Sequence, residues 1–200
     1  MRSTRRNRNR RGTRQQRNAT PRRGGSKIYT RNGNIKNLNE KFEELNFFRK
    51  EFSSPGEVAI ARLIQQHPHP NIVKVYRVSD SSIDIEEVRP FGVGGAPRYD
   101  KKTLIAAMTK AKDHLQSLGV MYIDWKPDNI GLASDGNYKL YDFDASGVTK
   151  PNKKNWSIKP PEWWKYGQAI ASGIEDPVEM NNFAFDIGLV RDNYKPVSTQ

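Results

Sequence analysis

The chain has 200 residues, enough for one folded unit with a tail, and hydrophobic residues make up only 35% of it. It has no cysteine, which excludes disulfides and thiolate metal sites, and no apolar run approaches the ~20 residues of a membrane span. The basic N-terminus is followed by no apolar segment, so we expect no secretory signal peptide and an intracellular location.

The positive charge is concentrated in residues 1–27. This segment holds 11 of the 34 Lys and Arg residues and no acidic residue, so it carries +11 of the formal net charge of +12. Residues 28–200 hold the other 23 basic side chains and all 22 acidic ones, and are nearly neutral. Because its like charges repel and it is mostly polar, the segment cannot form a core. We expect an arm whose contact residues are Arg5, Arg6, Arg8, Arg10, Arg11, Arg14, Arg17, Arg22 and Arg23.

The arm has more than one interpretation. Guanidinium groups bind phosphate in a planar, bidentate geometry, so the arm is a candidate for binding nucleic acid or an acidic protein surface. The alternatives are a solvated tail and a nuclear-import signal. All of these interpretations fit the composition of residues 1–27.

Short strands are expected on both sides of the first helix. The pair Asn32-Gly33 is a strong hairpin signal, and the aromatic-rich segment 41–52 is expected to end in a strand. Segments 71–78 and 82–88 alternate or run apolar, which is typical of paired strands.

The first helix has a clear start and end. Ser54 suits the N-cap, Pro55 the first helical position, and Glu57 the third position of a capping box. Two His-Pro pairs at residues 67–70 end the helix. We therefore predict a helix between Ser54 and His67.

The clearest helix covers residues 101–118, after a flexible link at 92–97 that contains Gly and Pro. Its apolar residues recur at heptad-like spacing, and Gly119 ends it. These apolar residues are Leu104, Met108, Ala111, Leu115 and Leu118.

The last third of the chain is expected to begin with a hairpin. Asp135-Gly136 is a turn signal between two apolar segments. A polar, lysine-rich loop is expected over residues 144–160, and a final helical piece near 183–190.

A cluster of polar side chains lies in the segment YIDWKPDN, residues 122–129. Asp124 and Asn129 lie five residues apart in a loop, and Asp142 ends a strand beyond it. Mg²⁺ prefers oxygen ligands and is usually held by one or two carboxylates plus substrate phosphates, so Asn129 and Asp142 are candidate metal ligands. Asp124 is then available to accept a hydroxyl proton, and Lys126 to neutralise charge on a transferred phosphate.

This spacing is similar to the protein-kinase signature of Asp-x-x-x-x-Asn followed by a hairpin that ends in Asp-Phe. Four other segments resemble kinase motifs in the family order: HPNIVKVY the link from the C-helix to the fourth strand, YDFDAS the DFG segment, KPPEW the APE segment, and FAFDIGLV the F-helix. The chain thus resembles the protein-kinase-like superfamily over about residues 50–190. It looks like a minimal, truncated member of the kind that large DNA viruses encode.

The resemblance implies an α+β, bilobal protein-kinase-like fold. Residues 28–90 would form a reduced small lobe and residues 91–200 a truncated large lobe, with the basic arm 1–27 extending from the N-terminus. The large lobe is expected to lack its later helices because the chain ends soon after Asp186.

The resemblance also implies roles for individual residues. The candidate residues are Asp124 and Lys126 for catalysis, Asn129 and Asp142 for magnesium, and Lys50, Glu57, Glu87 and Val88 for ATP. Either Lys50 or Arg49 could occupy the position of the family's lysine that binds the ATP phosphates. Glu57 could instead serve only as a helix cap. Glu162 would match the APE glutamate, with Arg191 as a candidate partner, and Asp186 would hold the backbone of the catalytic loop.

Three departures from the kinase pattern reduce the affinity for a nucleotide that the resemblance would imply. No glycine-rich loop precedes the first helix, since residues 28–38 contain only Gly33. Phe48 lies on the Lys50 face of its strand, where the family has a small alanine against adenine. Asp144 replaces the DFG glycine and adds a second carboxylate near the phosphates or another cation ligand.

Two hypotheses follow from the matches and the departures. The first is a non-catalytic or weakly active scaffold, a pseudokinase without a cofactor. It would act in a nucleic-acid-containing assembly such as a virion, as a minor capsid component contacting neighbouring structural proteins. In that case Asp124 and Asn129 only brace the backbone. The alternative is a minimal ATP- and Mg²⁺-dependent protein kinase of the Ser/Thr type.

Overall fold

In the computed structural model, the described residues are 29–31, 47–51, 53–91, 97–162 and 164–191. The predicted arm and the predicted Asn32-Gly33 hairpin turn lie outside these ranges. The predicted boundaries at residues 27 and 90, and the division into two lobes, stay predictions.

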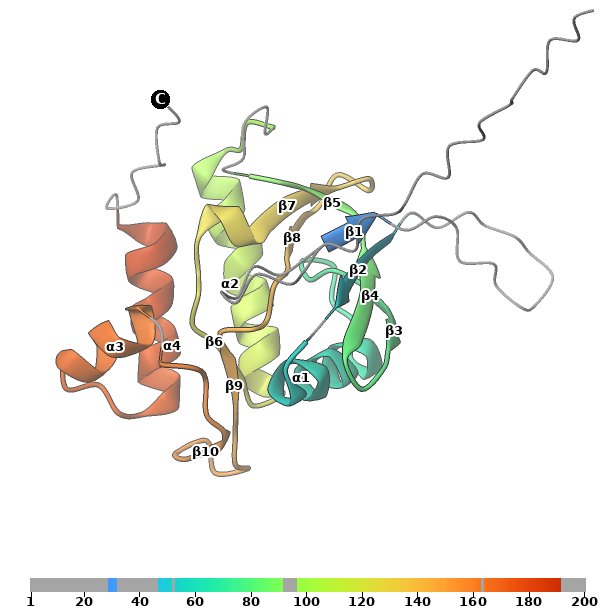
Figure 1. Cartoon of the computed structure of the whole chain (residues 1–200). Coiled ribbons are helices and arrows are strands. Elements are labelled where there is room, and N and C mark those ends of the chain that lie inside the picture. The colour runs from blue at the N-terminus through green and yellow to red at the C-terminus, as the bar shows by residue number, and fades with distance from the viewer. Residues whose placement is uncertain (1–28, 32–46, 52, 92–96, 163, 192–200) are drawn as a thin grey trace, which may run out of the picture.

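The described residues form a mixed α and β fold, as the sequence predicted (Figure 1). Its helices are α1 (Pro55–Gln66), α2 (Lys101–Ser117), α3 (Trp164–Ala171) and α4 (Pro177–Phe185), with the short helical turns η1 (Pro127–Asn129) and η2 (Asp186–Val190). Its strands are β1 (Tyr29–Arg31), β2 (Phe47–Glu51), β3 (Val75–Val78), β4 (Ser82–Glu86), β5 (Val88–Pro90), β6 (Val120–Tyr122), β7 (Ile130–Ala133), β8 (Tyr138–Leu140), β9 (Ser146–Thr149) and β10 (Trp156–Ile158).

The strands form three small antiparallel sheets. The largest has the order β1-β2-β4-β3, and α1 lies against it (Figure 1). The other two have the orders β10-β9-β6 and β5-β7-β8. The segment before β3 is tied to β8 by an isolated parallel bridge between Ile72 and Leu140. This bridge joins the four-stranded sheet to the sheet that contains β8.

Helix α1 begins where the sequence predicted. The Ser54 hydroxyl accepts a hydrogen bond from the Glu57 backbone N–H at 3.1 Å, and Pro55 occupies the first turn. Its buried face consists of Glu57, Val58, Ile60, Ala61 and Ile64. The carboxylate of Glu57 is therefore held in the interior rather than in solvent.

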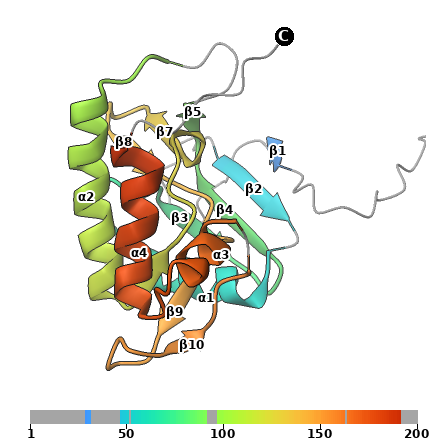
Figure 2. The same ribbon diagram turned by 90° about the vertical axis from the view of Figure 1, so that its left-hand side faces the viewer.

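Helix α2 packs against β6 and β8 and lies beside α4 (Figure 2). Four residues of its predicted apolar stripe are fully buried, namely Leu104, Met108, Ala111 and Leu115. Gly119 ends the helix with φ of 77°, a conformation that costs a glycine little. Lys112 donates to Asn182 at 2.9 Å and so links α2 to α4.

The predicted loop over residues 144–160 is wrong in part, because it contains β9 and β10. Strand β9 buries Ser146, Gly147 and Thr149 rather than large apolar side chains, so it carries no hydrophobic alternation. Thr149 N–H donates to the Gly119 carbonyl at 2.8 Å. A Cβ at Gly147 would lie 2.5 Å from the Trp156 ring, so only glycine allows β9 and β10 to approach this closely.

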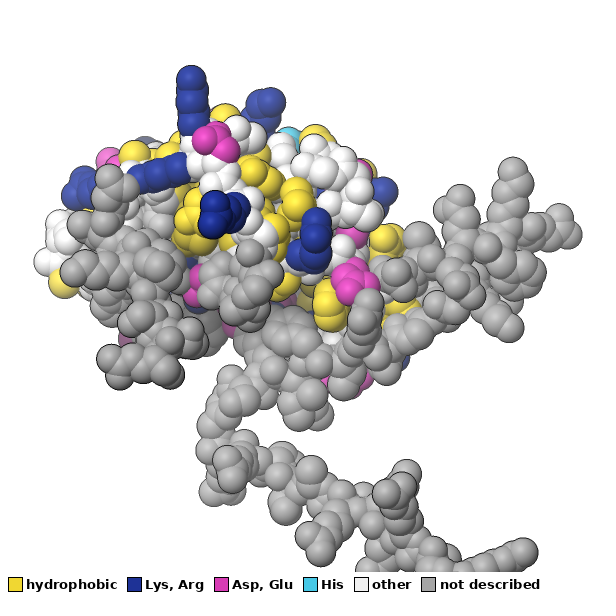
Figure 3. All heavy atoms as spheres, turned by 90° about the horizontal axis from the view of Figure 1, so that it is seen from above, with side chains coloured by type: hydrophobic (Ala, Val, Ile, Leu, Met, Phe, Trp, Pro, Cys, Tyr) yellow, Lys and Arg dark blue, Asp and Glu magenta, His cyan; other side chains and the backbone are white. Residues whose placement is uncertain are grey.

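Charges of both signs are distributed over the described surface. On the face seen in Figure 3, Lys and Arg side chains lie among hydrophobic and acidic ones. This agrees with the nearly neutral composition of residues 28–200. None of the helices in the described ranges combines the length and apolar character needed to cross a membrane.

Candidate active site

The loop after β6 is fixed by its hydrophobic side chains. Tyr122 and Trp125 are completely buried, and their rings pack edge to face with centroids 4.7 Å apart. The Trp125 indole N–H donates to the Asn181 side-chain oxygen at 2.9 Å. Burial raises the pKa of the Tyr122 hydroxyl well above its usual value, so this side chain stays neutral. These anchors fix the loop that carries Asp124 and Lys126, whose side chains are partly exposed.

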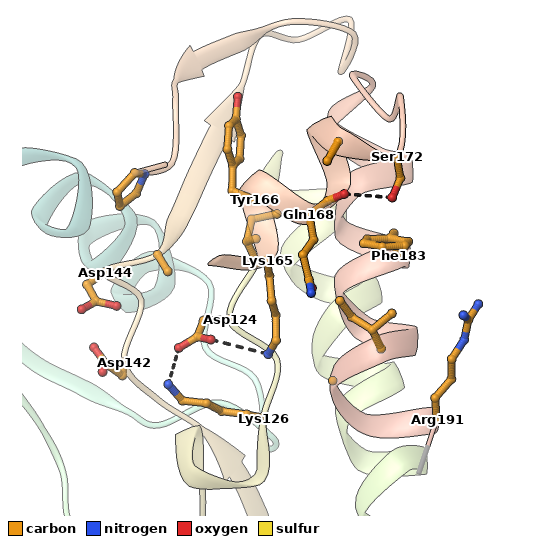
Figure 4. A pocket seen from close by; sticks show the side chains of 16 residues that line it. Asp124, Lys126, Asp142, Asp144, Lys165, Tyr166, Gln168, Ser172, Phe183 and Arg191 are labelled. Atoms are coloured by element: carbon orange, nitrogen blue, oxygen red, sulfur yellow. Dashed lines mark hydrogen bonds and ion pairs between the residues drawn. The ribbon is translucent and has the colours of Figure 1, made fainter. Parts of the chain in front are cut away.

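The carboxylate of Asp124 contacts the side chains of Lys126, Asn129 and Lys165. The Asn129 side-chain N–H₂ donates to the Asp124 carbonyl oxygen at 3.0 Å and to Oδ2 at 2.9 Å. Lys126 Nζ lies 2.6 Å from Oδ2, and Lys165 Nζ lies 3.5 Å from Oδ1 (Figure 4). The structure thus brings the side chains of Asp124, Lys126 and Asn129 together.

Lys50 joins the four-stranded sheet to the loop that follows β8. Its ammonium contacts the Glu57 carboxylate and lies 2.5 Å from Asp142 Oδ1. Lys50 and Glu57 are 3% and 4% exposed, so each charge depends on the other. Arg49 instead donates to both oxygens of Asp84, at 2.6 and 2.8 Å. Of the two candidates from the sequence, Lys50 is thus the one that contacts Glu57, and Glu57 makes this contact in addition to its place at the start of α1.

Asp142 has a left-handed backbone conformation with φ of 60°. This region is uncommon for residues other than glycine, and such strain is concentrated at functional sites. The turn directs the Asp142 carboxylate toward Lys50. Asp144 lines the same cavity as Asp124 and Asp142 (Figure 4), so three carboxylates border this space.

The donor set fits a magnesium ion held partly by a nucleotide. Because the Asn129 amide nitrogen donates to Asp124, its amide oxygen is the atom suited to a cation. No three His, Cys, Asp or Glu side chains within the described ranges gather as a metal site. One amide oxygen and the Asp142 carboxylate would be completed by phosphate oxygens and water, the usual pattern for Mg²⁺.

The predicted hinge lies between two strands. Glu87 connects β4 to β5, and Val88 pairs with Ala133 of β7. A Cβ at Gly131 would lie 2.7 Å from the Val88 side chain, so β7 approaches the hinge closely only because residue 131 is glycine. Phe48 lies two residues before Lys50 in the regular strand β2, on the face where strand alternation predicted it, and it pairs with Ile85 of β4.

A buried ion pair lies next to this hinge and was not predicted. Lys139 Nζ is 2.8 Å from both carboxylate oxygens of Glu86, and Asp135 lies 2.9 Å from the same ammonium. Burial alone would lower the pKa of Lys139, but the hydrogen bonds that its ammonium donates to Glu86 and Asp135 outweigh burial and raise the pKa above its usual value. The pair ties β4 to β8 across the hinge.

A cavity of about 920 Å³ opens beside Asp124. On one side lie the loop residues Asp124 and Lys126, and on the other α3 contributes Lys165 and Gln168 (Figure 4). Phe183 provides part of an apolar wall. The cavity is large enough for an acceptor group to approach Asp124.

Lys165 is a site residue that the sequence analysis missed. Its ammonium donates to the Trp125 carbonyl as well as contacting Asp124. Burial lowers the pKa of Lys165, and the attraction of Asp124 opposes this shift. Its place three residues after Glu162, at the start of a helix, was the only sequence signal.

Two predicted contacts are wrong. Glu162 pairs with Lys159 at 2.9 Å, and Arg191 pairs with Asp186 at 2.5 Å, so Arg191 is not the partner of Glu162. Asp186 does not serve as the predicted brace, because its carboxylate turns to Arg191. Contacts that brace the predicted catalytic loop come instead from Lys165 and Asn181, and from Tyr141, whose hydroxyl donates to the Asp128 carbonyl.

The chain is similar to known protein kinases over about half its length. It is 32% identical over 106 residues to CBL-interacting serine/threonine-protein kinase 26 of Arabidopsis thaliana. The matched segment covers 47% of this chain and 23% of that protein. It is 49% identical over 102 residues to putative ribosomal protein S6 kinase alpha-1 of Caenorhabditis elegans, covering 45% of this chain and 13% of that protein.

A third relative is cGMP-dependent protein kinase 2 of Rattus norvegicus, 30% identical over 108 residues, or 48% of this chain and 14% of that protein. No protein-family model matches the chain. The chain thus spans less than a quarter of the length of each of these curated relatives. The mixed α and β fold is compatible with theirs, and these similarities support a kinase-like superfamily for this chain.

Proposed function

We propose that this chain is a minimal ATP- and Mg²⁺-dependent phosphotransferase of the Ser/Thr protein-kinase type. The observation that carries the proposal is the buried contact of Lys50 with both Glu57 and Asp142. A buried ammonium with two carboxylates is costly unless it has a function or excellent geometry. This one links the predicted phosphate-binding strand to the predicted magnesium ligand.

The residues on the other side of the site have matching roles. Bound Mg-ATP would supply the phosphoryl group, held by Lys50, Asn129 and Asp142. Asp124 accepts the proton of the acceptor hydroxyl, whose oxygen forms the new bond to phosphorus as the bond to ADP breaks. Lys126, 2.6 Å from Asp124, offsets the negative charge of the transferred group.

The test is ADP release from Mg-ATP by the full chain, with a Ser/Thr-containing protein such as casein as acceptor. Replacing Asp124→Asn removes the proton acceptor and is expected to reduce turnover about 100-fold or more. The matched control is Asp113→Asn, because Asp113 is an exposed carboxylate on α2. Equal turnover in wild type and Asp124→Asn would rule out this role for Asp124.

The arginine-rich arm favours a second role beside catalysis. Residues 1–27 carry +11 while the remainder is nearly neutral, so binding to nucleic acid or to an acidic protein surface is concentrated there. The hypothesis of a non-catalytic virion scaffold gains nothing from the three relatives, which are described as kinases of plants and animals. We therefore propose the arm as a targeting segment of an active enzyme.

A further inference from the structure

Lys165 makes two contacts with the predicted catalytic loop from a different element. It lies in the first turn of α3, and its side chain crosses toward Asp124 (Figure 4). Its ammonium donates to the Trp125 carbonyl and lies 3.5 Å from Asp124 Oδ1. One cation thus contacts the side chain of one loop residue and the backbone of the next.

The two lysines at Asp124 are not equivalent. Lys126 and Asn129 contact Oδ2, whereas Lys165 contacts Oδ1. The Lys126 side chain is 33% exposed, so solvent weakens its attraction, but the Lys165 side chain is only 8% exposed. An ammonium buried to that extent needs oxygen acceptors, and the Trp125 carbonyl and Asp124 provide them. Together these contacts fix both oxygens of the carboxylate.

Fixing both oxygens restricts rotation of the carboxylate about its terminal bond. Such rotation would change which oxygen faces an acceptor hydroxyl in the adjoining cavity. Because phosphoryl transfer depends almost wholly on positioning, a misplacement of about 1 Å can cost on the order of 100-fold in rate. The Trp125 carbonyl contact adds a second restraint, because it holds the loop backbone next to Asp124.

We propose that Lys165 is a positioning residue that orients Asp124 for proton acceptance and couples this orientation to the placement of α3. The inference rests on the phosphotransferase activity proposed above. It adds a residue that the kinase-like motifs of the sequence do not contain. It also makes α3 a part of the catalytic arrangement.

The experiment compares Lys165→Met, Lys165→Arg and Lys165→Gln with wild type in Mg-ATP turnover on the same acceptor. We expect kcat of Lys165→Met to fall about 30- to 100-fold, with KM for Mg-ATP within twofold of wild type. Lys165→Arg keeps a charged donor and should restore at least tenfold of the loss. Lys165→Gln keeps a donor for the Trp125 carbonyl without the charge, and its kcat should lie between those of Lys165→Met and Lys165→Arg.

The matched control is Lys112→Met. Lys112 is a mostly covered lysine that donates to Asn182 at 2.9 Å, outside the cavity, so its loss should leave kcat unchanged. A double-mutant cycle with Asp124→Asn separates positioning from general destabilisation. If Lys165 acts through Asp124, Lys165→Met should cause no further loss of kcat in the Asp124→Asn background.

Three outcomes would overturn the inference. They are a wild-type kcat in Lys165→Met, a full additional loss in the Asp124→Asn background, and a loss in Lys112→Met equal to that in Lys165→Met. If wild type itself shows no turnover of Mg-ATP, the proposed function fails, and this inference fails with it. Failure of the inference alone is recognised by normal wild-type turnover with no selective effect at Lys165.

Discussion

Lys50 of β2 and Glu57 of α1 form a buried ion pair that joins the four-stranded sheet to α1. Lys50 precedes Glu57 by only seven positions, and Ser54 and Pro55 start the helix inside that short connection. Lys50 also lies 2.5 Å from Asp142, which follows β8. The pair therefore connects three parts of the chain, and its integrity should affect both stability and nucleotide binding.

Replacing Lys50→Met should destabilise the fold by about 3 kcal/mol, because it leaves the Glu57 carboxylate buried without its cation. Urea unfolding followed by circular dichroism measures this loss. Adding Glu57→Leu should recover part of it, since an apolar pair replaces the stranded charge. Lys150→Met, at an exposed lysine, is the control. If Lys50→Met were as stable as Lys150→Met, the buried ion pair of Lys50 and Glu57 would not contribute to stability as proposed.

Replacing Lys139→Met should also destabilise by about 3 kcal/mol at pH 7, because Glu86 loses its buried partner. The pKa of Lys139 is raised in the folded state, so its contribution is complete below the unfolded pKa of about 10.5. It is lost as pH rises through the higher folded pKa. The difference in unfolding free energy between wild type and variant should thus narrow above about pH 10.5. Lys154→Met, at an exposed lysine, should show no such pH dependence.

Replacing Gly188→Ala should disturb the loop that carries Asp124 and Trp125. A Cβ at this position would lie 1.9 Å from the Trp125 carbonyl oxygen, a distance that forces η2 and the loop apart. We expect a loss of about 3 kcal/mol in unfolding free energy. Gly167→Ala in α3 meets no heavy atom within 4 Å and should be neutral or stabilise by about 0.5 to 1 kcal/mol. Equal stability of the two variants in thermal unfolding would count against the close contact.

Removing residues 1–27 should abolish binding to a fluorescent DNA duplex measured by anisotropy. For the full chain we expect the affinity to fall about 1,000-fold between 50 and 200 mM salt, because many phosphate contacts release counterions. A variant with the nine arm arginines replaced by glutamine keeps the length of the arm and should behave like the truncated chain. Undiminished binding in either variant would assign the interaction to the nearly neutral remainder.

Local signals in the sequence predicted much of this fold. The Ser54-Pro55 start of α1, the Gly119 end of α2 and the Asp135-Gly136 turn follow from backbone and capping preferences that act within a few residues. The apolar stripe of α2 is buried as its periodicity predicted. In the candidate site, the close grouping of Asp124, Lys126 and Asn129 also follows from one short loop.

Contacts between distant segments could not be predicted in the same way. Strand β9 has no apolar alternation from which it could be predicted. Hydrogen bonds of Thr149 and close packing at Gly147 hold it in place instead. The pairing of Arg191 with Asp186 rather than Glu162 depends on the geometry of η2. Lys165 reaches Asp124 from 41 residues away, so its role depends on where α3 packs.

Calorimetric titration of the full chain with Mg-ATP tests the central claim most directly. Wild type should bind, and both Lys50→Met and Asp142→Asn should bind at least tenfold more weakly, because each removes a contact to phosphate or magnesium. Removal of magnesium with EDTA should weaken wild-type binding by a similar factor, while Lys150→Met should leave it unchanged. Absence of binding heat for wild type, or equal Kd values in wild type, Lys50→Met and Asp142→Asn, would contradict the proposed function.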